Sequence, residues 1–428
     1  MEKTPAGKTA FTFQFSLIGL LILLVMLTAA SICFICSIGL NGIFSSFAAA
    51  PLTPASWPVI LQKIRQECLF VIIAVSIAVG VLYILLGFHL ARIINRIFEH
   101  LVHGLHKLKN LDLSGGSSPE IRIKEIRKMH QTIEDLRIGL KSFRKYVPAD
   151  LVTELMSGSK EAELGVEKRD MTIYFSDIAG FTPLSEKLRP EELVEELSIY
   201  FDGMTQMIIA HKGTIDKYIG DSIMAFWGAP SNLESHAVWA CQAALRCQRY
   251  VYGLSREWIK RGLPPLKTRV GLHTGEVLVG NIGYSDRLNY TVIGDNVNIA
   301  SRLEGLNRYY ETEILISGST YQKAKEEIET RLIDVVVVKG RTQGVPVYEL
   351  AAEKNSLDSK WADFYGNFNE AMRLYLSREW DKAGEELARA ARISPNDKPL
   401  QIIRDRCTAY KKNPPPQDWQ GVVVMQKK

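Results

Sequence analysis

The sequence predicts an α+β protein with an apolar helical region, a mixed helix and strand region, and a helical tail. No charged residue lies between Lys8 and Lys63, although 23% of the chain is charged. From Met171 to Leu350, runs of β-branched and aromatic residues alternate with helical patterns. After Leu350, apolar residues recur at three- and four-residue steps, which indicates helices.

The composition excludes few functions but narrows the choice of partner. A net charge of +5 in 428 residues gives no indication of a nucleic-acid partner. The 6 cysteines do not have the spacing of a zinc site or a disulfide framework. We expect them to pack as small apolar residues. A redox role for Cys33 and Cys36 is the alternative, but that pair lies in a presumed membrane span.

Two uncharged runs predict transmembrane helices at residues 15–40 and 68–90, after a cytoplasmic segment at 1–14. About 20 apolar residues suffice to cross a bilayer as a helix. A cleaved signal peptide is the alternative for the first run, whose apolar core exceeds the usual length of about 7–15 residues. A buried core helix is the alternative for the second.

Basic residues at 92, 96, 107 and 109 follow the second run, so that end is expected to be cytoplasmic. The chain is therefore predicted to be a multi-pass protein of the cell inner (plasma) membrane, in contact with lipid and with its remaining domains in the cytoplasm. Residues 41–67 form a short extracytoplasmic loop, too small for a folded sensor domain. Either the spans sense a stimulus, or a partner does, or the anchor is passive.

Residues 91–144 show a helix, a break and a second helix. Two amphipathic helices directly after a span resemble a HAMP linker, which in its family forms a parallel four-helix bundle in a dimer. A plain dimerising stalk is the alternative. Both interpretations require dimerisation, because neither helix hides its apolar stripe alone. Residues 145–168 then form an entrance segment.

Two aspartates follow strand-like runs and are predicted to face each other. Asp177 ends the first run, and Asp221 occupies a tight turn between two further runs. Carboxylate oxygens at such positions hold Mg²⁺, and backbone N–H groups of the turn near Phe181 and Thr182 can cradle phosphates. Two close carboxylates repel each other unless cations neutralise them.

A third motif places Asn298 and Arg302 four residues apart on one helical face. The pair offers a hydrogen-bond donor and a fixed cation for ribose and phosphate, and the alternative is a solvated surface helix. Asp295 is expected to cap this helix. His211 and His273 are expected to have structural roles.

These motifs, together with the segments 270–277 and 338–341, resemble the class III nucleotidyl cyclase catalytic domain over residues 169–352. The resemblance implies a ferredoxin-like antiparallel sheet with helices on one face. It also implies a head-to-tail homodimer with two complete active sites at its interface. The implied reaction converts ATP to 3′,5′-cyclic AMP and pyrophosphate.

By this resemblance, Asp177 and Asp221 bind two Mg²⁺ or Mn²⁺ ions per active site, and Ile178 lends a backbone carbonyl to one ion. Lys217 matches the lysine that selects adenine. Thr291 lies where most animal adenylate cyclases carry Asp, and a threonine there resembles the subgroup called class IIIb.

The remaining implied roles concern the ribose and the phosphates. Asn298 orients the ribose, Arg302 stabilises charge in the transition state, and Lys339 reaches the terminal phosphates, with Phe181 and Thr182 nearby. A guanylate cyclase is one alternative, although it would carry Glu in place of Lys217. A catalytically silent membrane signalling scaffold is the other.

The tail, residues 357–412, shows helical patterns whose first two members resemble a tetratricopeptide-like hairpin. At least three repeats are usually needed for a free-standing solenoid. We therefore expect the tail to pack on the preceding domain or on the dimer partner.

Overall fold

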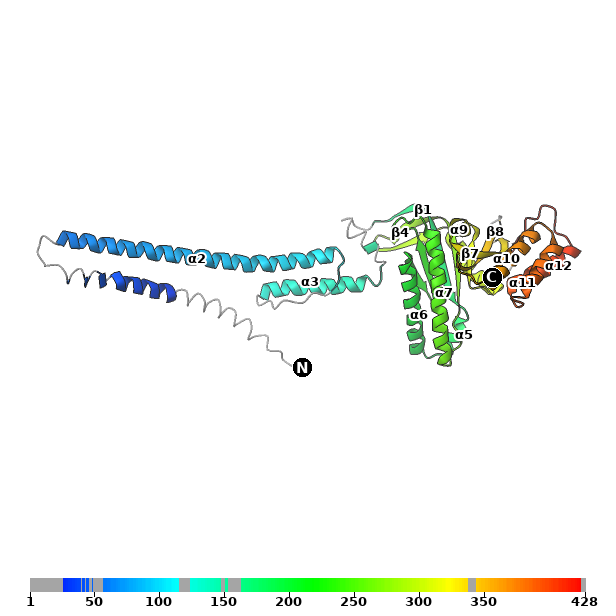
Figure 1. The fold of residues 1–428 in the computed structure, drawn as a ribbon, viewed down its shortest axis with the longest axis horizontal. Coiled ribbons are helices and arrows are strands. Elements are labelled where there is room, and N and C mark those ends of the chain that lie inside the picture. The colour runs from blue at the N-terminus through cyan, green and yellow to red at the C-terminus, as the bar shows by residue number, and fades with distance from the viewer. Residues whose placement is uncertain are drawn as a thin grey trace. The chain divides into compact units, whose positions relative to one another are not determined.

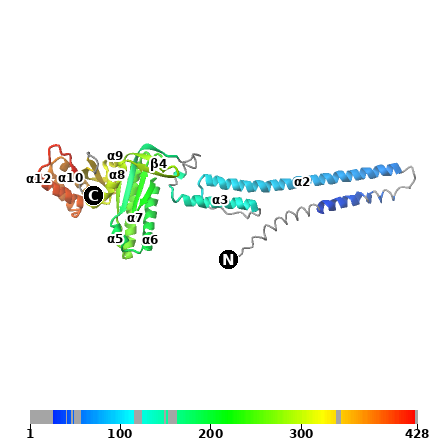
Figure 2. The same ribbon diagram turned by 180° about the vertical axis from the view of Figure 1, so that it is seen from behind.

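The computed structural model describes residues 26–39, 41–42, 44–45, 48, 57–114, 124–147, 151–152, 163–337 and 344–424. The chain divides into two compact units (Figures 1 and 2). The first comprises Met1–Val147 and Val152–Ser159, and the second Pro148–Leu151 and Lys160–Lys428. Each unit is described by itself.

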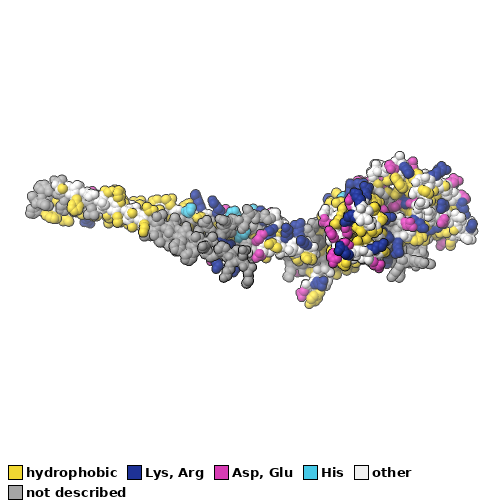
Figure 3. All heavy atoms as spheres, turned by 90° about the horizontal axis from the view of Figure 1, so that it is seen from below, with side chains coloured by type: hydrophobic (Ala, Val, Ile, Leu, Met, Phe, Trp, Pro, Cys, Tyr) yellow, Lys and Arg dark blue, Asp and Glu magenta, His cyan; other side chains and the backbone are white. Residues whose placement is uncertain are grey.

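The first unit contains the helices α2 (Trp57–Lys109) and α3 (Lys124–Phe143). Among the described residues, α2 is the one helix long and apolar enough to cross a membrane, and none of its most apolar window is buried. Hydrophobic side chains cover much of its surface (Figure 3). The predicted span at 68–90 lies inside α2. Of the predicted span at 15–40, the described part is a shorter apolar helix, Met26–Gly39.

The start of α2 differs from the predicted loop at 41–67, because the helix already begins at Trp57. Pro58 occupies its first turn, where a proline removes no intrahelical hydrogen bond. No later proline interrupts α2, so the expected first linker helix after residue 91 continues the apolar helix without a break. Span and linker are thus one element.

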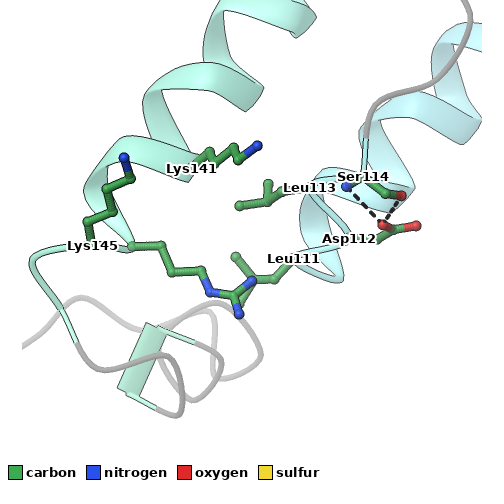
Figure 4. A pocket seen from close by; sticks show the side chains of 7 residues that line it. Leu111, Asp112, Leu113, Ser114, Lys141 and Lys145 are labelled. Atoms are coloured by element: carbon green, nitrogen blue, oxygen red, sulfur yellow. Dashed lines mark hydrogen bonds between the residues drawn. The ribbon is translucent and has the colours of Figure 1, made fainter. Parts of the chain in front are cut away.

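α2 and α3 run side by side in the same direction (Figures 1 and 2). Leu111 leaves α2 with a positive φ of 55°, and Leu113 is then buried. The Leu113 carbonyl accepts a hydrogen bond of 2.7 Å from Arg137 of α3. Figure 4 shows the Asp112 carboxylate bonded to Ser114 beside the cationic end of α3. The segment after α2, residues 111–114, is therefore held against α3 by the hydrogen bond between Leu113 and Arg137.

The second unit is built on a mainly antiparallel sheet. Among the described residues it has 9 strands in the order β2-β3-β1-β4-β6-β8-β7-β9, and β5 pairs with β4. The pairs β4–β6 and β7–β9 are parallel. The bounds are β1 Gly165–Ile178, β2 Thr214–Ile219, β3 Ser222–Trp227, β4 Thr268–Tyr284, β5 Arg287–Ile293, β6 Ile314–Ser317, β7 Ile328–Val337, β8 Val345–Glu353 and β9 Val422–Val424.

Helices cover both faces of this sheet, whereas the family resemblance led us to expect them on one. Ile314 and Ile316 of β6 belong to a core cluster shared with α6 and α7, but Leu315 belongs to a cluster shared with α8. Successive strand residues point to opposite faces, so strands that are apolar on both sides need cover on both. The helices are α5 Phe181–Ser185, α6 Pro190–Ala210, α7 His236–Lys260, α8 Asp295–Tyr310 and α9 Gly318–Ala324.

The tail packs on the sheet region, as one of the two predicted placements requires. Its helices share a buried apolar cluster with α8, β6, β7 and β8. Arg331 of β7, 3% exposed, forms bidentate hydrogen bonds of 2.9 and 2.7 Å with Asp397, which caps the last tail helix. The tail helices are α10 Ser359–Leu376, α11 Trp380–Ala391 and α12 Lys398–Lys412.

A β-bulge in β7 positions Asp334 for a second contact with the tail. Leu332 pairs with Tyr348 and Asp334 with Val347, so two residues of β7 advance for one of β8. A bulge places neighbouring side chains on the same side of a sheet. Asp334, fully buried, thereby accepts hydrogen bonds from Arg406 of α12 at 2.7 Å and from Tyr310 of α8 at 2.6 Å.

Candidate active site

The structure brings Asp177 and Asp221 together. Asp177 is the next-to-last residue of β1, and Asp221 lies in the tight turn between β2 and β3. Gly220 supplies the positive φ of 63° that this turn requires. The backbone N–H of Ile178 donates to the Asp221 carboxylate at 3.2 Å. The two carboxyl groups also share a hydrogen bond, so the predicted pairing of these side chains is present in the fold.

The electrostatics of this pair indicate an excess of negative charge. Burial, followed by the hydrogen bond and charge of Asp221, raises the pKa of Asp177 from 3.8 to about 8. Burial also raises the pKa of Glu304, on α8, to about 7. Arg269, directly opposite Asp177 in the β1–β4 register, lowers both pKa values through its charge. Carboxylates held this close favour a proton or a cation between them.

Lys217 and Thr291 meet at a second cluster, between β2 and β5. The Lys217 ammonium donates to the Thr291 hydroxyl at 3.4 Å. The Thr291 hydroxyl in turn donates to Asp216 at 2.5 Å. The Asp216 side chain is 2% exposed and lies 3.3 Å from the Lys217 ammonium. The two residues predicted to select the base are therefore neighbours that share one buried carboxylate.

Helix α8 carries Asn298 and Arg302, and it lies close against β4. A Cβ at Gly271 would lie 2.2 Å from the backbone nitrogen of Glu304, so this approach requires glycine. Asn298 is exposed. Arg302 has a buried Nη1 for which the described residues offer no hydrogen-bond partner. A buried cationic donor without an acceptor fits a site that is completed by an anionic group.

The expected cap of α8 is wrong by one residue. Gly294, with φ of 150°, is the residue that precedes the helix, and it makes no side-chain capping bond. Asp295 is the first helical residue. Its carboxylate lies in the first turn, where a negative charge interacts favourably with the helix dipole.

Known proteins match the part of the chain that holds these clusters. Residues 166–352 match the family described as "Adenylate and Guanylate cyclase catalytic domain". This segment is a cyclase catalytic domain. It contains both clusters and α8, whereas the tail begins after the matched residues.

Individual relatives of this cyclase domain include two curated adenylate cyclases. The chain is 35% identical to Adenylate cyclase 1 of Rhizobium meliloti over 290 residues, 68% of this chain and 44% of that protein. It is 38% identical to the adenylate cyclase of Anabaena cylindrica over 223 residues, 51% of this chain and 44% of that protein. Among solved structures, the adenylyl cyclase CyaB from P. aeruginosa is 37% identical, with 46% of this chain and 100% of that chain covered and a TM-score of 0.42. The chain thus spans less than half the length of the two curated relatives.

The other predicted site residues of the cyclase domain lie near the aspartates or outside the described residues. Phe181 and Thr182 begin α5, and Gly180 precedes them with φ of 72°. The first N–H groups of a helix have no intrahelical partner, so they are available to an anion. Lys339 lies outside the described residues.

Within one chain, the aspartate pair and the cluster of Lys217, Thr291 and Asp216 are separate from each other. No hydrogen bond or ion pair among the residues that the structure describes joins the aspartate pair to Lys217, Asn298 or Arg302. In addition, no three His, Cys, Asp or Glu side chains of the described residues are arranged to hold a metal ion by themselves.

Three polar residues of the site were not singled out from the sequence. Asp216 precedes Lys217, and a regular strand would have turned it away. Glu304 and Arg269 act on the aspartates from α8 and β4 across long sequence separations. Both histidines make hydrogen bonds within the fold, which agrees with structural roles but does not test them: His273 bonds Asn296 at 3.0 Å, and His211 bonds the Met207 carbonyl at 2.7 Å.

Proposed function

We propose that the chain is a membrane-bound adenylate cyclase that converts ATP to 3′,5′-cyclic AMP and pyrophosphate. The observation that carries the proposal is that the fold holds the carboxyl groups of Asp177 and Asp221 together. Their proximity, together with burial, raises the pKa of Asp177 to about 8. Phosphoryl transfer depends on positioning and on neutralising charge. Its relatives named as adenylate cyclases support the same reaction.

The aspartate pair would hold two Mg²⁺ or Mn²⁺ ions. The donor set fits hard cations, since it consists of carboxylate oxygens, to which the family resemblance adds the backbone carbonyl of Ile178. The raised pKa of Asp177 also supports this assignment, because the fold places these carboxyl groups together without a sufficient countercharge. Such ions, when bound, supply charge neutralisation on the attacking and leaving oxygens.

The chain's own residues supply binding and orientation. Lys217 and Thr291 present polar groups to the base, and their identities favour adenine over guanine. Asn298 on the exposed side of α8 orients the ribose. Arg302 extends its unpaired Nη1 toward the phosphate whose charge develops in the transition state. Phe181 and Thr182 offer backbone N–H groups to the phosphates.

Two copies of the chain complete each site. The aspartates of one protomer face Lys217, Thr291, Asn298 and Arg302 of its partner, which accounts for the separation of the aspartate pair from the Lys217 cluster within one chain. A symmetric homodimer then holds two equal sites. Two exposed apolar side chains, Ile219 at the end of β2 (52% exposed) and Leu278 within β4 (43% exposed), support an uncovered apolar surface on the sheet.

The purified full-length chain tests the reaction. With Mn²⁺ and ATP it should release cyclic AMP, and an Asp221→Asn variant should not. ATP binding without product would establish the catalytically silent scaffold instead. Competing GTP against ATP distinguishes the guanylate cyclase, because equal or better turnover of GTP would refute the adenine preference.

The N-terminal unit anchors and dimerises the enzyme at the inner membrane. The apolar helix α2, the parallel course of α3 and the buried Leu113 in the connector support a HAMP-like linker after a multi-pass anchor. Deleting residues 1–90 should change the specific activity even when the shortened protein stays dimeric. Unchanged kinetics in a dimeric truncation would mark the membrane part as a passive anchor.

A further inference from the structure

A β-bulge in β2 turns two successive charged residues toward Thr291. Ile215 pairs with Ala225 and Lys217 with Met224, so Asp216 is the extra residue of β2. In a regular strand, Asp216 and Lys217 would point to opposite faces. The bulge brings both to the same side, where the carboxylate and the ammonium each contact the Thr291 hydroxyl or one another.

Asp216 is buried where it accepts hydrogen bonds from its neighbours. Its side chain is 2% exposed, and three donors approach it: the Thr291 hydroxyl, the Lys217 ammonium and the backbone N–H of Val292. Burial raises the pKa of Asp216 above its usual value, and these three donors oppose that rise. An ionised carboxylate has no proton to give, so the direction of the bond to Thr291 is fixed.

The fixed direction determines what Thr291 can offer to a ligand. A hydroxyl has one proton and two lone pairs. The proton of Thr291 is committed to Asp216 at 2.5 Å, so only the lone pairs face outward. The cluster therefore presents one donor, the Lys217 ammonium, beside one acceptor, the Thr291 oxygen.

We propose that Asp216 determines the choice of base by holding Thr291 as a hydrogen-bond acceptor. This inference rests on the proposed cyclase function. Adenine has an amino donor at position 6 and an acceptor at ring nitrogen 1, which complement Thr291 and Lys217. Guanine has an acceptor and a donor at these two positions, so in the same pose both of its groups are mismatched. Most animal adenylate cyclases carry a carboxylate at the position of Thr291. In this chain the carboxylate belongs to Asp216, which acts on the base through the Thr291 hydroxyl.

The test is Asp216→Asn in the full-length chain. Asparagine keeps the shape, but its amide can donate to Thr291 and so lets the hydroxyl turn its proton outward. We expect the ratio of kcat/KM for ATP over GTP to fall by about tenfold, because one mispaired buried polar group typically changes such a ratio by about that factor. Thr291→Val, which lacks both the donor and the acceptor, should weaken ATP use without improving GTP use. Asp202→Asn, on the exposed side of α6, is the matched control and should leave the ratio unchanged.

The outcomes separate this inference from the function on which it rests. A wild-type protein that makes no cyclic nucleotide overturns both. A wild-type adenylate cyclase in which Asp216→Asn slows ATP and GTP equally overturns the role of Asp216 alone, because a purely structural residue would act in that way. If the variant is too slow to assay, competition of ATP and GTP for a fluorescent nucleotide gives the affinity ratio. An unchanged ratio in that measurement also overturns the inference.

Discussion

Asp221→Asn should abolish the cyclase activity and should make the metal-free protein more stable. In the wild type, burial and the neighbouring carboxyl group raise the pKa of Asp177 to about 8. The folded state therefore binds a proton that the unfolded state releases near the usual pKa of 3.8. Stability contributed by this proton is present at acid pH and is lost as the pH rises from about 4 to about 8. Burial, the largest cause, stays in the variant, so replacing Asp221 removes only the part of this loss that comes from the neighbouring carboxyl group.

The magnitude follows from the burial of the pair. For a fully buried carboxyl group, a pKa change from 3.8 to about 8 corresponds to about 6 kcal/mol. Asp177 is only half-buried, so screening by water reduces the expected gain of the variant to about 2 kcal/mol. For a domain of this size, that gain raises Tm by about 5 °C. Asparagine still accepts from the Ile178 N–H, so the turn itself is expected to keep its geometry.

The assay is thermal unfolding of the full-length protein in EDTA at pH 8 and at pH 5. The variant should melt higher than the wild type at pH 8, and the difference should narrow at pH 5. Added Mn²⁺ should reverse the order, because a bound cation stabilises only the state that binds it. Asp202→Asn controls for the loss of a carboxylate elsewhere. A variant that melts lower than the wild type in EDTA at pH 8 would refute this account of the site.

Three further outcomes are expected. Arg406→Ala should lower the free energy of unfolding by about 3–5 kcal/mol in denaturant titrations, because it leaves Asp334 charged and fully buried; an effect below about 1 kcal/mol would mean that Asp334 is not held by α12. Equimolar mixtures of inactive Asp221→Asn and inactive Arg302→Ala should recover about a quarter of the wild-type cyclase activity, since random dimers contain that share of intact sites; no recovery would contradict sites shared between protomers. Burial lowers the pKa of His236, so its contribution to stability is complete above about pH 6.5 and lost below it; His236→Gln should therefore lose less stability than the wild type between pH 7 and pH 5.5, and parallel losses would exclude a titrating His236.

The sequence by itself determined where several predicted site residues lie in their strands, turns and helices, because these placements depend on local patterns. Asp177 lies at the end of a strand, and Asp221 follows a glycine in a two-residue turn. Asn298 and Arg302 are about one helical turn apart, so they share a face of their helix. The apolar helix was equally readable, since a long run without charge specifies a helix that must be covered by lipid or protein. The sequence also predicted that the tail packs against another surface, because a single helical hairpin cannot bury its own apolar face, but it left open whether that surface is the preceding domain or the dimer partner.

Only the tertiary structure decided the features that depend on register and on distant partners. Alternation within a strand predicts that Asp216 turns away from Lys217, and the pairing of β2 with β3 overrides this by inserting a bulge. The same holds for Asp334, which a second bulge turns toward Arg406 of the tail. The cover on both faces of the sheet likewise follows from where α8 packs, not from its own sequence. Such features arise from contacts between residues far apart in the chain, and a sequence pattern records which residues are apolar or charged but not which strand lies beside them.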